Sequence, residues 1–260
     1  MAHNKDSEKL DQPIFVWGIQ PIFELFSTDH IDNIKAIYSL ESFGRKKHQK
    51  KLLSLIERHG FNVEKVNNFK QIGLKKDVVH QGICLLLKPF WWRDPKEIHT
   101  LKKDAILIAC DNITDPQNLG AIIRSAHGLG ASGVIVPSKC CAPITGSVIK
   151  ASCGAVFKLP IFRVGNLVRE LEELKKINFW IMGLTPEASR PIWDIDLCKA
   201  SVIVVGSEGK GVRTLVKRVC DELLSIPLVG NIGSLNASVA AAIALYESLR
   251  QRHFGLREGK

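Results

Sequence analysis

Three short segments in the second half of the chain combine glycines with polar side chains that could hold or activate a ligand. They are residues 111–124, 206–211 and 230–238. Each follows a run of apolar residues, which predicts that each loop begins where a buried strand ends. The carboxyl ends of parallel strands share one edge of a sheet, where ligands of α/β proteins usually bind. We therefore expect the three loops to form one pocket, although each alone is also compatible with an ordinary structural turn.

The chemistry of that pocket would involve a carboxylate and a guanidinium. Glu208 lies inside the glycine-rich loop, where a carboxylate would repel an anionic ligand. It suits a basic partner or a ligand that donates hydrogen bonds, and Arg124 is the natural candidate for that partner. The sequence has no Ser-His-Asp order, no cluster of histidines and no carboxylate pair with an obvious acid–base role. These features argue against a hydrolase and against a metal-dependent enzyme.

The loop of residues 206–211 does not match the known phosphate-binding patterns. A Walker A loop needs Lys and then Ser or Thr after its second glycine, whereas Val212 and Arg213 follow here. A dinucleotide fingerprint that begins at Gly209 fails at Thr214, which stands in place of Gly or Ala. The loop is better suited to close backbone contact with a flat ligand, with a tight structural turn as the alternative. A dinucleotide-dependent oxidoreductase is therefore a weak interpretation.

An alternation of apolar strands and amphipathic helices predicts the elements that position these loops, and it indicates an α/β protein. In the second half, continuous apolar runs predict strands that are buried on both faces of a parallel sheet. The strands predicted there are residues 105–110, 133–137, 157–164, 179–184, 201–205 and 223–229. One helix is expected at residues 121–129 and a second from Asn166 to residue 177. A third should end at Cys220, and a fourth should follow the suitable N-caps Ser234, Asn236 and Ser238. Residues 138–155 show no clear pattern.

The first part of the chain predicts a smaller α/β unit. Its strands are expected at residues 14–18, 33–40, 61–66 and 82–88, with helices after Gln20 and at residues 49–59. We predict a disordered tail at residues 1–12, a substrate-binding domain at 13–89, a linker at 90–103 and a catalytic domain at 104–260. Trp91 and Trp92 in the linker could stack on bases, but packing of the linker onto a domain is the favoured interpretation.

The charge of the chain favours a polyanionic partner. The net charge is +10 and the pI is about 9.3, and nucleic acid is the commonest partner of such proteins. Arg45, Lys46, Lys47 and Lys50 lie together at the start of a predicted helix, where they oppose the helix dipole. They would either bind RNA phosphates or form a solvated face, and the sequence favours neither.

The cysteines and the N-terminus predict a cytoplasmic protein. No apolar run reaches the roughly 18 residues of a membrane span, and the polar N-terminus lacks the apolar core of a signal peptide. The seven cysteines are odd in number and include no CxxC pair. We therefore expect free, mostly buried thiols and no metal site.

Three ordered motifs resemble the SpoU/TrmH family of RNA ribose 2′-O-methyltransferases, which belongs to the SPOUT superfamily. The motifs are DPQNLGAIIR at residues 115–124, GSEGKG at 206–211, and IPL with SLNASVA at 226–228 and 234–240. The resemblance covers residues 104–260. Residues 14–90 resemble the substrate-binding domain that precedes the catalytic domain in some members. This layout is closest to members that methylate a guanosine of large-subunit (23S) ribosomal RNA.

The resemblance implies a fold and a chemistry that the residue pattern alone does not give. It implies a deep trefoil knot in the C-terminal α/β domain, S-adenosyl-L-methionine as the methyl donor, and a homodimer formed through that domain. The residues that match the functional polar positions are Asn118, Arg124, Glu208, Ser234 and Asn236. The expected donor-binding residues are Gly206, Ile226, Gly230, Leu235 and Ser238. A tRNA methyltransferase of the same family and a non-catalytic RNA-binding or assembly factor remain alternatives.

The resemblance assigns activation of the ribose hydroxyl to Arg124. An arginine has a pKa above about 12 and is a poor base. We therefore expect Arg124 to stabilise the developing alkoxide and to clamp phosphate, with Glu208 and Asn236 orienting it or the ribose. One departure from the family pattern is Gly233, which stands where relatives often carry a polar residue. Only backbone contacts could come from that position.

Overall fold

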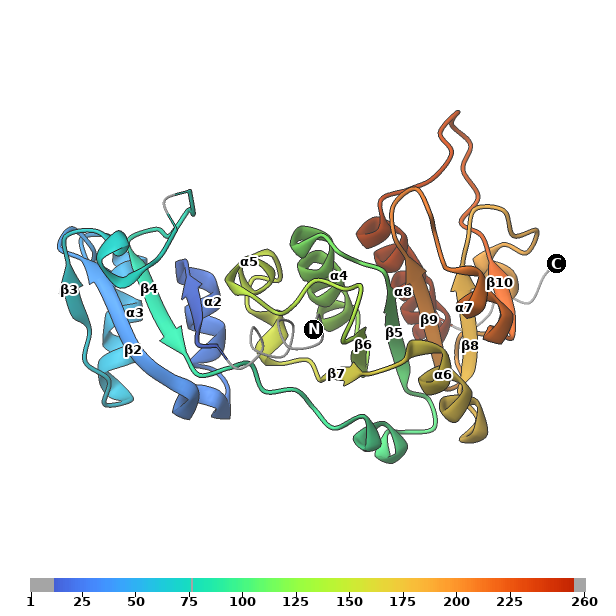
Figure 1. Cartoon of the computed structure of the whole chain (residues 1–260), viewed down its shortest axis with the longest axis horizontal. Helices are drawn as coiled ribbons and strands as arrows, with labels where there is room; N and C mark the ends of the chain where they lie inside the picture. The colour runs from blue at the N-terminus through green and yellow to red at the C-terminus, as the bar shows by residue number, and fades with distance from the viewer. Residues whose placement is uncertain (1–11, 76, 255–260) are drawn as a thin grey trace, which may run out of the picture. The chain divides into compact units, whose positions relative to one another are not determined.

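The chain folds into two compact units, which the computed structural model describes over residues 12–75 and 77–254 (Figure 1). The first unit contains the described residues up to Trp91 together with Pro143–Lys158. The second contains Trp92–Ala142 and the described residues from Leu159 onward. The predicted tail at residues 1–12 lies outside the described residues, apart from Gln12. None of the described helices is both long enough and apolar enough to cross a bilayer.

The first unit is built on a four-stranded sheet in the order β1-β4-β2-β3. The strands are β1 (Ile14–Trp17), β2 (Ile34–Leu40), β3 (Glu64–Val66) and β4 (Ile83–Leu87). β4 runs antiparallel to β1 and β2, whereas β3 runs parallel to β2. The helices are α2 (Ile19–Leu25) and α3 (Lys47–Arg58), with 3₁₀ helices η1 (Asp29–Asn33) and η2 (Phe69–Ile72). The predicted strands and helices are present, although β3 begins three residues later than expected.

A segment from the second half of the sequence completes the first unit. It contains helix α5 (Gly146–Ala151) and the 3₁₀ helix η4 (Ala155–Phe157), where the sequence shows no clear pattern. Helix α5 packs against β1. A Cβ atom at Gly146 would overlap the carbonyl oxygen of Phe15 and the ring of Trp17, so only glycine permits this close approach. The strand predicted at residues 157–164 is correspondingly shorter, because its first residue belongs to η4.

The segment predicted as a linker is packed and partly helical. Trp91 stacks on Phe157, with ring centroids 5.7 Å apart, and on Phe90 at 5.2 Å. This confirms packing as the role of Trp91 in the structure. The 3₁₀ helix η3 (Pro95–Thr100) follows, and the Asp94 side chain caps it by accepting the N–H of Lys96 at 2.9 Å.

The second unit is built on six parallel strands in the order β10-β8-β9-β5-β6-β7. The strands are β5 (Ile106–Asp111), β6 (Gly133–Pro137), β7 (Ile161–Val164), β8 (Trp180–Leu184), β9 (Ser201–Gly206) and β10 (Glu222–Leu224). The predicted parallel sheet is confirmed, so the carboxyl ends of its strands share one edge. β10 is shorter than the strand predicted at residues 223–229, since Pro227 lacks the N–H that a strand ladder needs.

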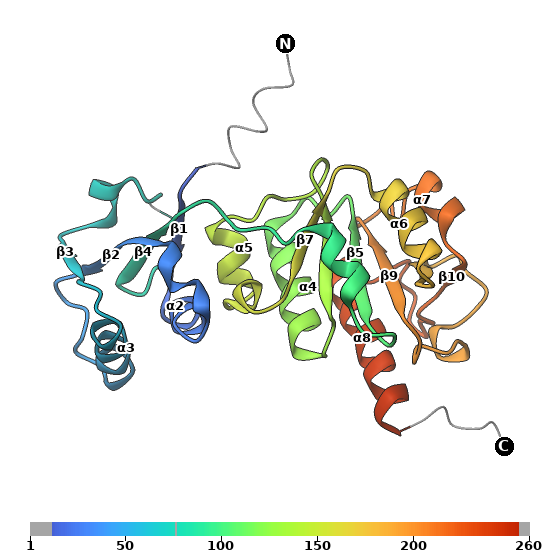
Figure 2. The same ribbon diagram turned by 90° about the horizontal axis from the view of Figure 1, so that it is seen from below.

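Helices cover both faces of this parallel sheet, as its continuous apolar strands predict (Figure 2). They are α4 (Pro116–Gly128), α6 (Leu167–Lys176), α7 (Thr214–Val219) and α8 (Ala237–Phe254). α6 packs against α7, and α8 packs against α4 and β9. α4 begins at Pro116 rather than at residue 121. The Asp115 side chain accepts the N–H of Gln117 at 3.1 Å, and proline suits the first helical position.

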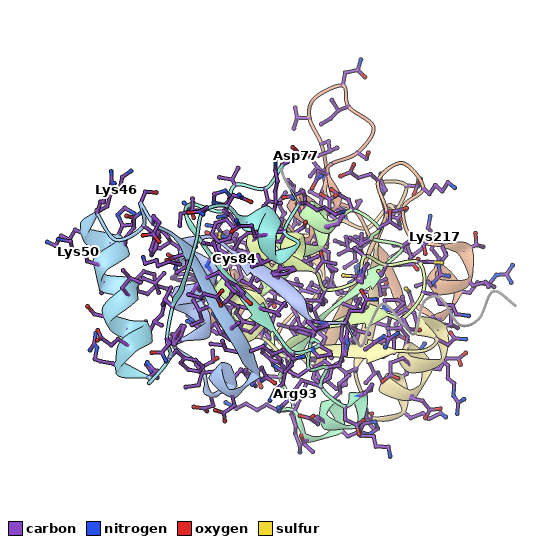
Figure 3. The ribbon with its side chains drawn as sticks, turned by 60° about the vertical axis from the view of Figure 1, so that its left-hand side comes forward. Lys46, Lys50, Asp77, Cys84, Arg93 and Lys217 are labelled. Atoms are coloured by element: carbon purple, nitrogen blue, oxygen red, sulfur yellow. The ribbon has the colours of Figure 1, made fainter. Side chains whose placement is uncertain are left out.

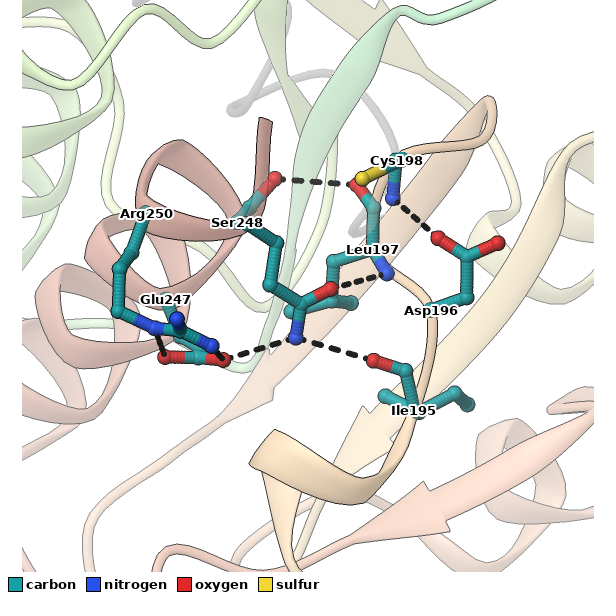
Figure 4. A network of polar contacts seen from close by, with 8 residues as sticks. Ile195, Asp196, Leu197, Cys198, Glu247, Ser248 and Arg250 are labelled. Atoms are coloured by element: carbon teal, nitrogen blue, oxygen red, sulfur yellow. Dashed lines mark hydrogen bonds and ion pairs between the residues drawn. The ribbon is translucent and has the colours of Figure 1, made fainter. Parts of the chain in front are cut away.

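A buried polar network anchors the C-terminal half of α8 (Figure 4). Gln251 is buried, and its Oε1 accepts the N–H of Leu197 at 2.8 Å while its Nε2 donates to the carbonyl of Ile195 at 3.1 Å. Arg250 donates two hydrogen bonds to Glu247, at 2.8 and 2.7 Å. Because buried polar groups need such partners, α8 is held against the connection between β8 and β9. The trefoil knot implied by the family resemblance stays a prediction.

All seven cysteines are free thiols, as predicted. Burial raises the pKa of the Cys84 thiol to about 12 and that of Cys141 to about 11. Only Cys84 and Cys110 are buried, four others are half-buried and Cys140 is exposed, so the expectation of mostly buried thiols is wrong. Within residues 12–75 and 77–254, no group of three or more His, Cys, Asp or Glu side chains could hold a metal ion.

Candidate active site

The predicted polar loops converge at the carboxyl edge of the parallel sheet. β5 and β9 are neighbours there, and Asp111 lies opposite Gly206 in their register. α4 follows β5 and carries Asn118 in its first turn, with Arg124 further along. The glycine-rich loop of residues 206–211 follows β9, and the segment after β10 leads into α8. Residues that are far apart in the sequence therefore meet at this edge.

Asn118, Glu208 and Asn236 form a closed polar cluster. Asn118 Nδ2 donates to Glu208 Oε1 at 2.9 Å, and Asn236 Nδ2 donates to Asn118 Oδ1 at 2.9 Å. Asn236 Nδ2 also donates to the same carboxylate oxygen of Glu208. The members come from three different motifs, and Asn118 and Asn236 are 118 positions apart in the sequence. Two amide groups thus hold one carboxylate in a fixed position.

The start of helix α8 fixes the orientation of the Asn236 amide. Its Oδ1 accepts the backbone N–H of Ser238 at 2.9 Å and the Ser238 hydroxyl at 2.6 Å. This is the N-cap arrangement, in which a side-chain oxygen satisfies an unpaired helical N–H group. Because the oxygen is used at the helix, the Nδ2 group must face Glu208. The sequence suggested Ser234, Asn236 and Ser238 as N-caps, and the structure selects Asn236.

Arg124 does not form the predicted pair with Glu208. The carboxylate of Glu208 accepts hydrogen bonds from the two asparagines instead. Arg124 is exposed, and within the described part of the chain its guanidinium makes no hydrogen bond and no ion pair. Its five N–H donors are therefore available to a ligand that binds beside α4.

Glu208 also lines a cavity of about 340 Å³. The other predicted site residues that line it are Gly206, Ile226, Ser234 and Leu235. Gly230 and Ser238, which were also expected to bind the donor, are not among the lining residues. Ser238 points its donors at Asn236 instead, and Gly230 is exposed. The cavity thus contains three of the five expected donor-binding residues.

The glycines of residues 206–211 shape this cavity. A Cβ atom at Gly206 would overlap backbone atoms of Gly211 and Val212, because the loop returns closely over the strand end. The N–H of Gly211 donates to the carbonyl of Ser207 at 2.8 Å. Gly209 and Gly211 have φ of 79° and 63°, which side-chain-bearing residues rarely adopt. The loop therefore presents backbone directly to the cavity.

One wall of the cavity was missed by the sequence interpretation. It consists of Leu184, Thr185, Pro186 and Glu187, of which the last three follow the predicted strand at 179–184, where the sequence predicts only a long connection. The signal was available, because this segment follows β8 and the carboxyl end of β8 lies at the same sheet edge as that of β9. Applying the strand-end rule to every strand of the predicted sheet would have found it.

Charged groups of both signs surround the cavity. Two carboxylates, those of Glu187 and Glu208, line it together with one lysine, Lys210. A hydrogen bond from Thr185 lowers the pKa of Glu187, so this side chain is ionised at neutral pH. Lys217 pairs with Glu187, with its Nζ 3.5 Å from Glu187 Oε2 and 3.3 Å from Thr185 Oγ1, so two lysines face the two carboxylates.

In the first unit, the predicted RNA-binding residues occupy the exposed start of α3. Arg45, Lys46, Lys47 and Lys50 are all exposed, and Figure 3 shows Lys46 and Lys50 pointing outward from this helix. No acidic residue lies in the first turn to offset them. Gln49 supports the turn, because its Oε1 accepts the N–H groups of Lys46 and Gly44 at 3.1 and 3.2 Å.

Two family models match the chain in the order that the motifs predict. Residues 105–246 match the SpoU rRNA methylase family, and residues 15–91 match the RNA 2′-O ribose methyltransferase substrate-binding family. The chain belongs to the SpoU methylase family. This confirms the resemblance that the three motifs indicate. Asn118, Glu208 and Asn236 all lie within the stretch that matches the SpoU family.

Similar proteins agree with this assignment. The chain is 35% identical over 241 residues to the 23S rRNA (guanosine-2′-O-)-methyltransferase RlmB of Pasteurella multocida, covering 91% of this chain and 98% of that protein. It is 43% identical over 200 residues to an uncharacterized tRNA/rRNA methyltransferase of Synechocystis, covering 75% of this chain but only 52% of that protein. The SpoU methyltransferase AviRb of Streptomyces viridochromogenes, solved in complex with AdoMet, superposes with a TM-score of 0.77 at 23% identity. That superposition covers 96% of this chain and 94% of AviRb, and it confirms the fold.

Proposed function

We propose that this SpoU family member transfers a methyl group from S-adenosyl-L-methionine to the ribose 2′-hydroxyl of a guanosine in 23S ribosomal RNA. The observation that carries the proposal is the cluster of Asn118, Glu208 and Asn236, in which Glu208 also lines the cavity formed by the loops. The choice of a 23S rRNA guanosine is supported by RlmB of Pasteurella multocida, because that alignment covers nearly the whole of both chains.

The residues that line the cavity fit S-adenosyl-L-methionine. When bound, this donor supplies a methyl group on a positively charged sulfur. The carboxylate of Glu208 would offset that charge. Ile226 and Leu235 offer apolar contact to a flat ring, and the glycine loop offers backbone groups for hydrogen bonds. Gly230 and Ser238 would contribute only through the geometry of the segment that they flank.

The transfer forms a bond between the ribose 2′-oxygen and the methyl carbon, breaks the bond between that carbon and sulfur, and releases the hydroxyl proton to solvent. Arg124 would stabilise the negative charge that develops on the 2′-oxygen, since its guanidinium is exposed and has no partner among residues 12–75 and 77–254. Its high pKa makes it a poor base. Asn118, Glu208 and Asn236 orient the reacting ribose, and Ser234 lines the same cavity as Glu208.

The first unit would recruit the RNA in the cytoplasm, where ribosomal RNA is available. Residues 15–91 match a substrate-binding family, and the cations at the start of α3 suit the phosphates of a structured RNA. Neutral side chains at those positions would remove the contact without disturbing the sheet, because all four residues are exposed.

The active protein would be a homodimer formed through the second unit. Val239, Ile243 and Tyr246 follow one face of α8 and are 45%, 37% and 59% exposed. Together with Leu129 they line a shallow apolar hollow of about 450 Å³. Contiguous exposed apolar side chains are typical of protein–protein contacts. Tyr246→Glu should then shift the protein from dimer to monomer in analytical ultracentrifugation, whereas a wild-type monomer would refute this part of the proposal.

The decisive experiment maps 2′-O-methyl groups in ribosomal and transfer RNA from cells with and without this protein. We expect one guanosine of 23S rRNA to lose its methyl group, and expression of the wild-type chain to restore it. Arg124→Ala should not restore it. Loss of a methyl group from a tRNA instead would assign the protein to tRNA. If no methyl group is lost while the purified protein still binds ribosomal RNA, the protein is a binding or assembly factor and the proposal fails.

A further inference from the structure

A single charged side chain is fully buried in the described residues, and the proposed chemistry does not use it. Asp111 has no solvent exposure. Its Oδ2 accepts the backbone N–H of Arg213 at 2.8 Å, and its Oδ1 accepts the Nε–H of the same residue at 2.6 Å. A buried carboxylate is strongly unfavourable unless it is paired and hydrogen-bonded in this way. The arrangement therefore needs a reason beyond stability.

The position of Asp111 suggests that reason. It is the last residue of β5 and lies opposite Gly206, the last residue of β9. Arg213 is the N-cap residue of α7 and follows the glycine-rich loop. The loop is therefore fixed at both ends, by the strand ladder at Gly206 and by the Asp111 carboxylate at Arg213. Asn112 has φ of 61°, so the chain turns sharply away from the sheet directly after Asp111.

The loop between these two fixed points has little freedom to adjust. Close packing of Gly206 against Gly211 and Val212 means that a shift at Arg213 must displace the backbone that lines the cavity. The same loop carries Glu208, whose hydrogen bonds to Asn118 and Asn236 depend on its position. Asp111 itself is not among the lining residues of the cavity.

We propose that Asp111 is a positioning residue for the methyl donor: its paired hydrogen bonds to Arg213 hold the loop of residues 206–211 in the conformation that binds the donor and places Glu208. The inference rests on the proposed function for the identity of the donor, but not for the effect on the loop. Asp111 acts through the loop and does not touch the substrate. Loss of its charge should loosen the loop before any ligand is present.

The chain offers a matched control at the opposite edge of the same sheet. Asp221 also accepts one backbone N–H, from Ile181 at 2.9 Å, and pairs with one cation, Lys175, at 2.7 Å. It lies beside the amino ends of β8 and β10, away from the cavity. Asp111→Asn and Asp221→Asn remove the same charge from the same type of contact. Asp111 is fully buried and Asp221 is 30% exposed, so the free energy of unfolding of both variants is measured as well, and a difference in exchange or donor binding is assigned to location only where it exceeds the difference in stability.

The test measures amide hydrogen exchange of the 206–213 segment in the ligand-free full chain, and titrates S-adenosyl-L-methionine by calorimetry. We expect Asp111→Asn to speed exchange in that segment and to weaken donor binding about tenfold or more, as expected when a charged hydrogen bond is broken. Asp221→Asn should leave both unchanged, and RNA affinity should stay at the wild-type value in both variants. Arg213→Lys keeps the cation and the backbone donor but loses Nε–H, so it should give an intermediate result if Asp111→Asn fails to fold.

Two outcomes would overturn the inference. Wild-type exchange and donor affinity in Asp111→Asn and Arg213→Lys would show that the pair does not position the loop. Equal weakening by Asp111→Asn and Asp221→Asn would show a general loss of stability. If the wild-type chain binds no S-adenosyl-L-methionine, the proposed function fails, while the exchange measurement still decides whether Asp111 holds the loop.

Discussion

The two units carry their candidate functional residues in opposite ways. In the first unit, the basic residues at the start of α3 are neighbours in the sequence and are all exposed. In the second, Asn118, Glu208 and Asn236 come from elements as much as 118 positions apart and meet through hydrogen bonds. A parallel sheet makes this possible, because it gathers the carboxyl ends of distant strands at one edge. If both sets of residues serve the proposed function, the first arrangement would act through summed charge and the second through geometry.

This difference predicts how each unit responds to mutation. Charge that is shared among several exposed side chains is lost gradually as they are removed. A site whose geometry depends on several elements loses its activity when one critical atom is removed, or when one added atom displaces the others. Single substitutions should therefore have large effects at the parallel sheet and small effects on α3.

The largest expected effect is that of Arg124→Ala. If the guanidinium stabilises charge that develops only during transfer, kcat should fall by about 10²–10³ while the Kd for S-adenosyl-L-methionine stays at the wild-type value. Single-turnover methylation of ribosomal RNA measures the first quantity, and calorimetry measures the second. Arg218→Ala, which removes another exposed arginine of the same unit, is the control and should retain activity. Normal transfer by Arg124→Ala would remove this residue from the mechanism.

The next effect is that of Gly206→Ala. A Cβ atom there would overlap backbone that cannot rotate away, and overpacking of this kind destabilises by about 1–3 kcal/mol or more. Donor binding should weaken up to about a hundredfold. At Gly230 a Cβ atom would meet nothing within 4 Å, so Gly230→Ala should bind the donor normally. Equal binding by the two variants would mean that the loop conformation at Gly206 does not control the cavity.

The sequence predicted the sheet and the meeting of its loops, because both follow from local patterns. Apolar runs gave strands close to the observed limits, and the strand-end rule placed residues 111–124 and 206–211 together. The single pocket expected from all three loops is only partly present, because no residue of 111–124 lines the cavity. The family motifs supplied the identity of Asn118, Glu208 and Asn236 as site residues, which remains a proposal. The knot depends on how one segment of the chain passes through another. No local sequence pattern encodes this, so the knot also remains a prediction.

Contacts between distant residues were the part that the sequence could not supply. Glu208 was expected to pair with Arg124 on the basis of charge, but its carboxylate accepts hydrogen bonds from the side-chain amides of Asn118 and Asn236 instead. The link from Asp111 to Arg213 spans 102 positions and leaves no periodic pattern. Residues 143–158 fold with the first unit because Gly146 and its neighbours pack on β1, which is formed by residues far earlier in the chain. Each of these depends on tertiary geometry rather than on local propensity.

Gly146→Ala tests whether residues 143–158 are part of the first unit. The added Cβ would overlap Trp17 and the backbone of Phe15, and should destabilise that unit by about 1–3 kcal/mol. At Gly165 a Cβ atom would meet nothing within 4 Å, so Gly165→Ala is the control. Hydrogen exchange in β1 and β4 should increase in Gly146→Ala and stay unchanged in the control. Protection that is lost only around β6 and β7 would instead assign the segment to the second unit.

The smallest expected effect comes from the basic residues of the first unit. Replacing Lys46, Lys47 and Lys50 together by Gln should weaken RNA binding roughly tenfold and reduce the slope of log K against log salt by about 2. A matched triple, in which the exposed Lys65, Lys70 and Lys75 are replaced by Gln, changes the net charge equally elsewhere in the unit. Binding titrations over a range of salt concentrations compare the two.

Stability separates the two interpretations of these cations. Each opposes the helix dipole at the start of α3, so their removal should stabilise the helix by about 0.3–1 kcal/mol per charge at low salt. If they bind RNA, the variant is more stable and binds more weakly. If they form only a solvated face, the variant is more stable and its salt slope matches that of the Lys65, Lys70 and Lys75 control. The same substitution thus decides whether the cations at the start of α3 bind RNA or form only a solvated face.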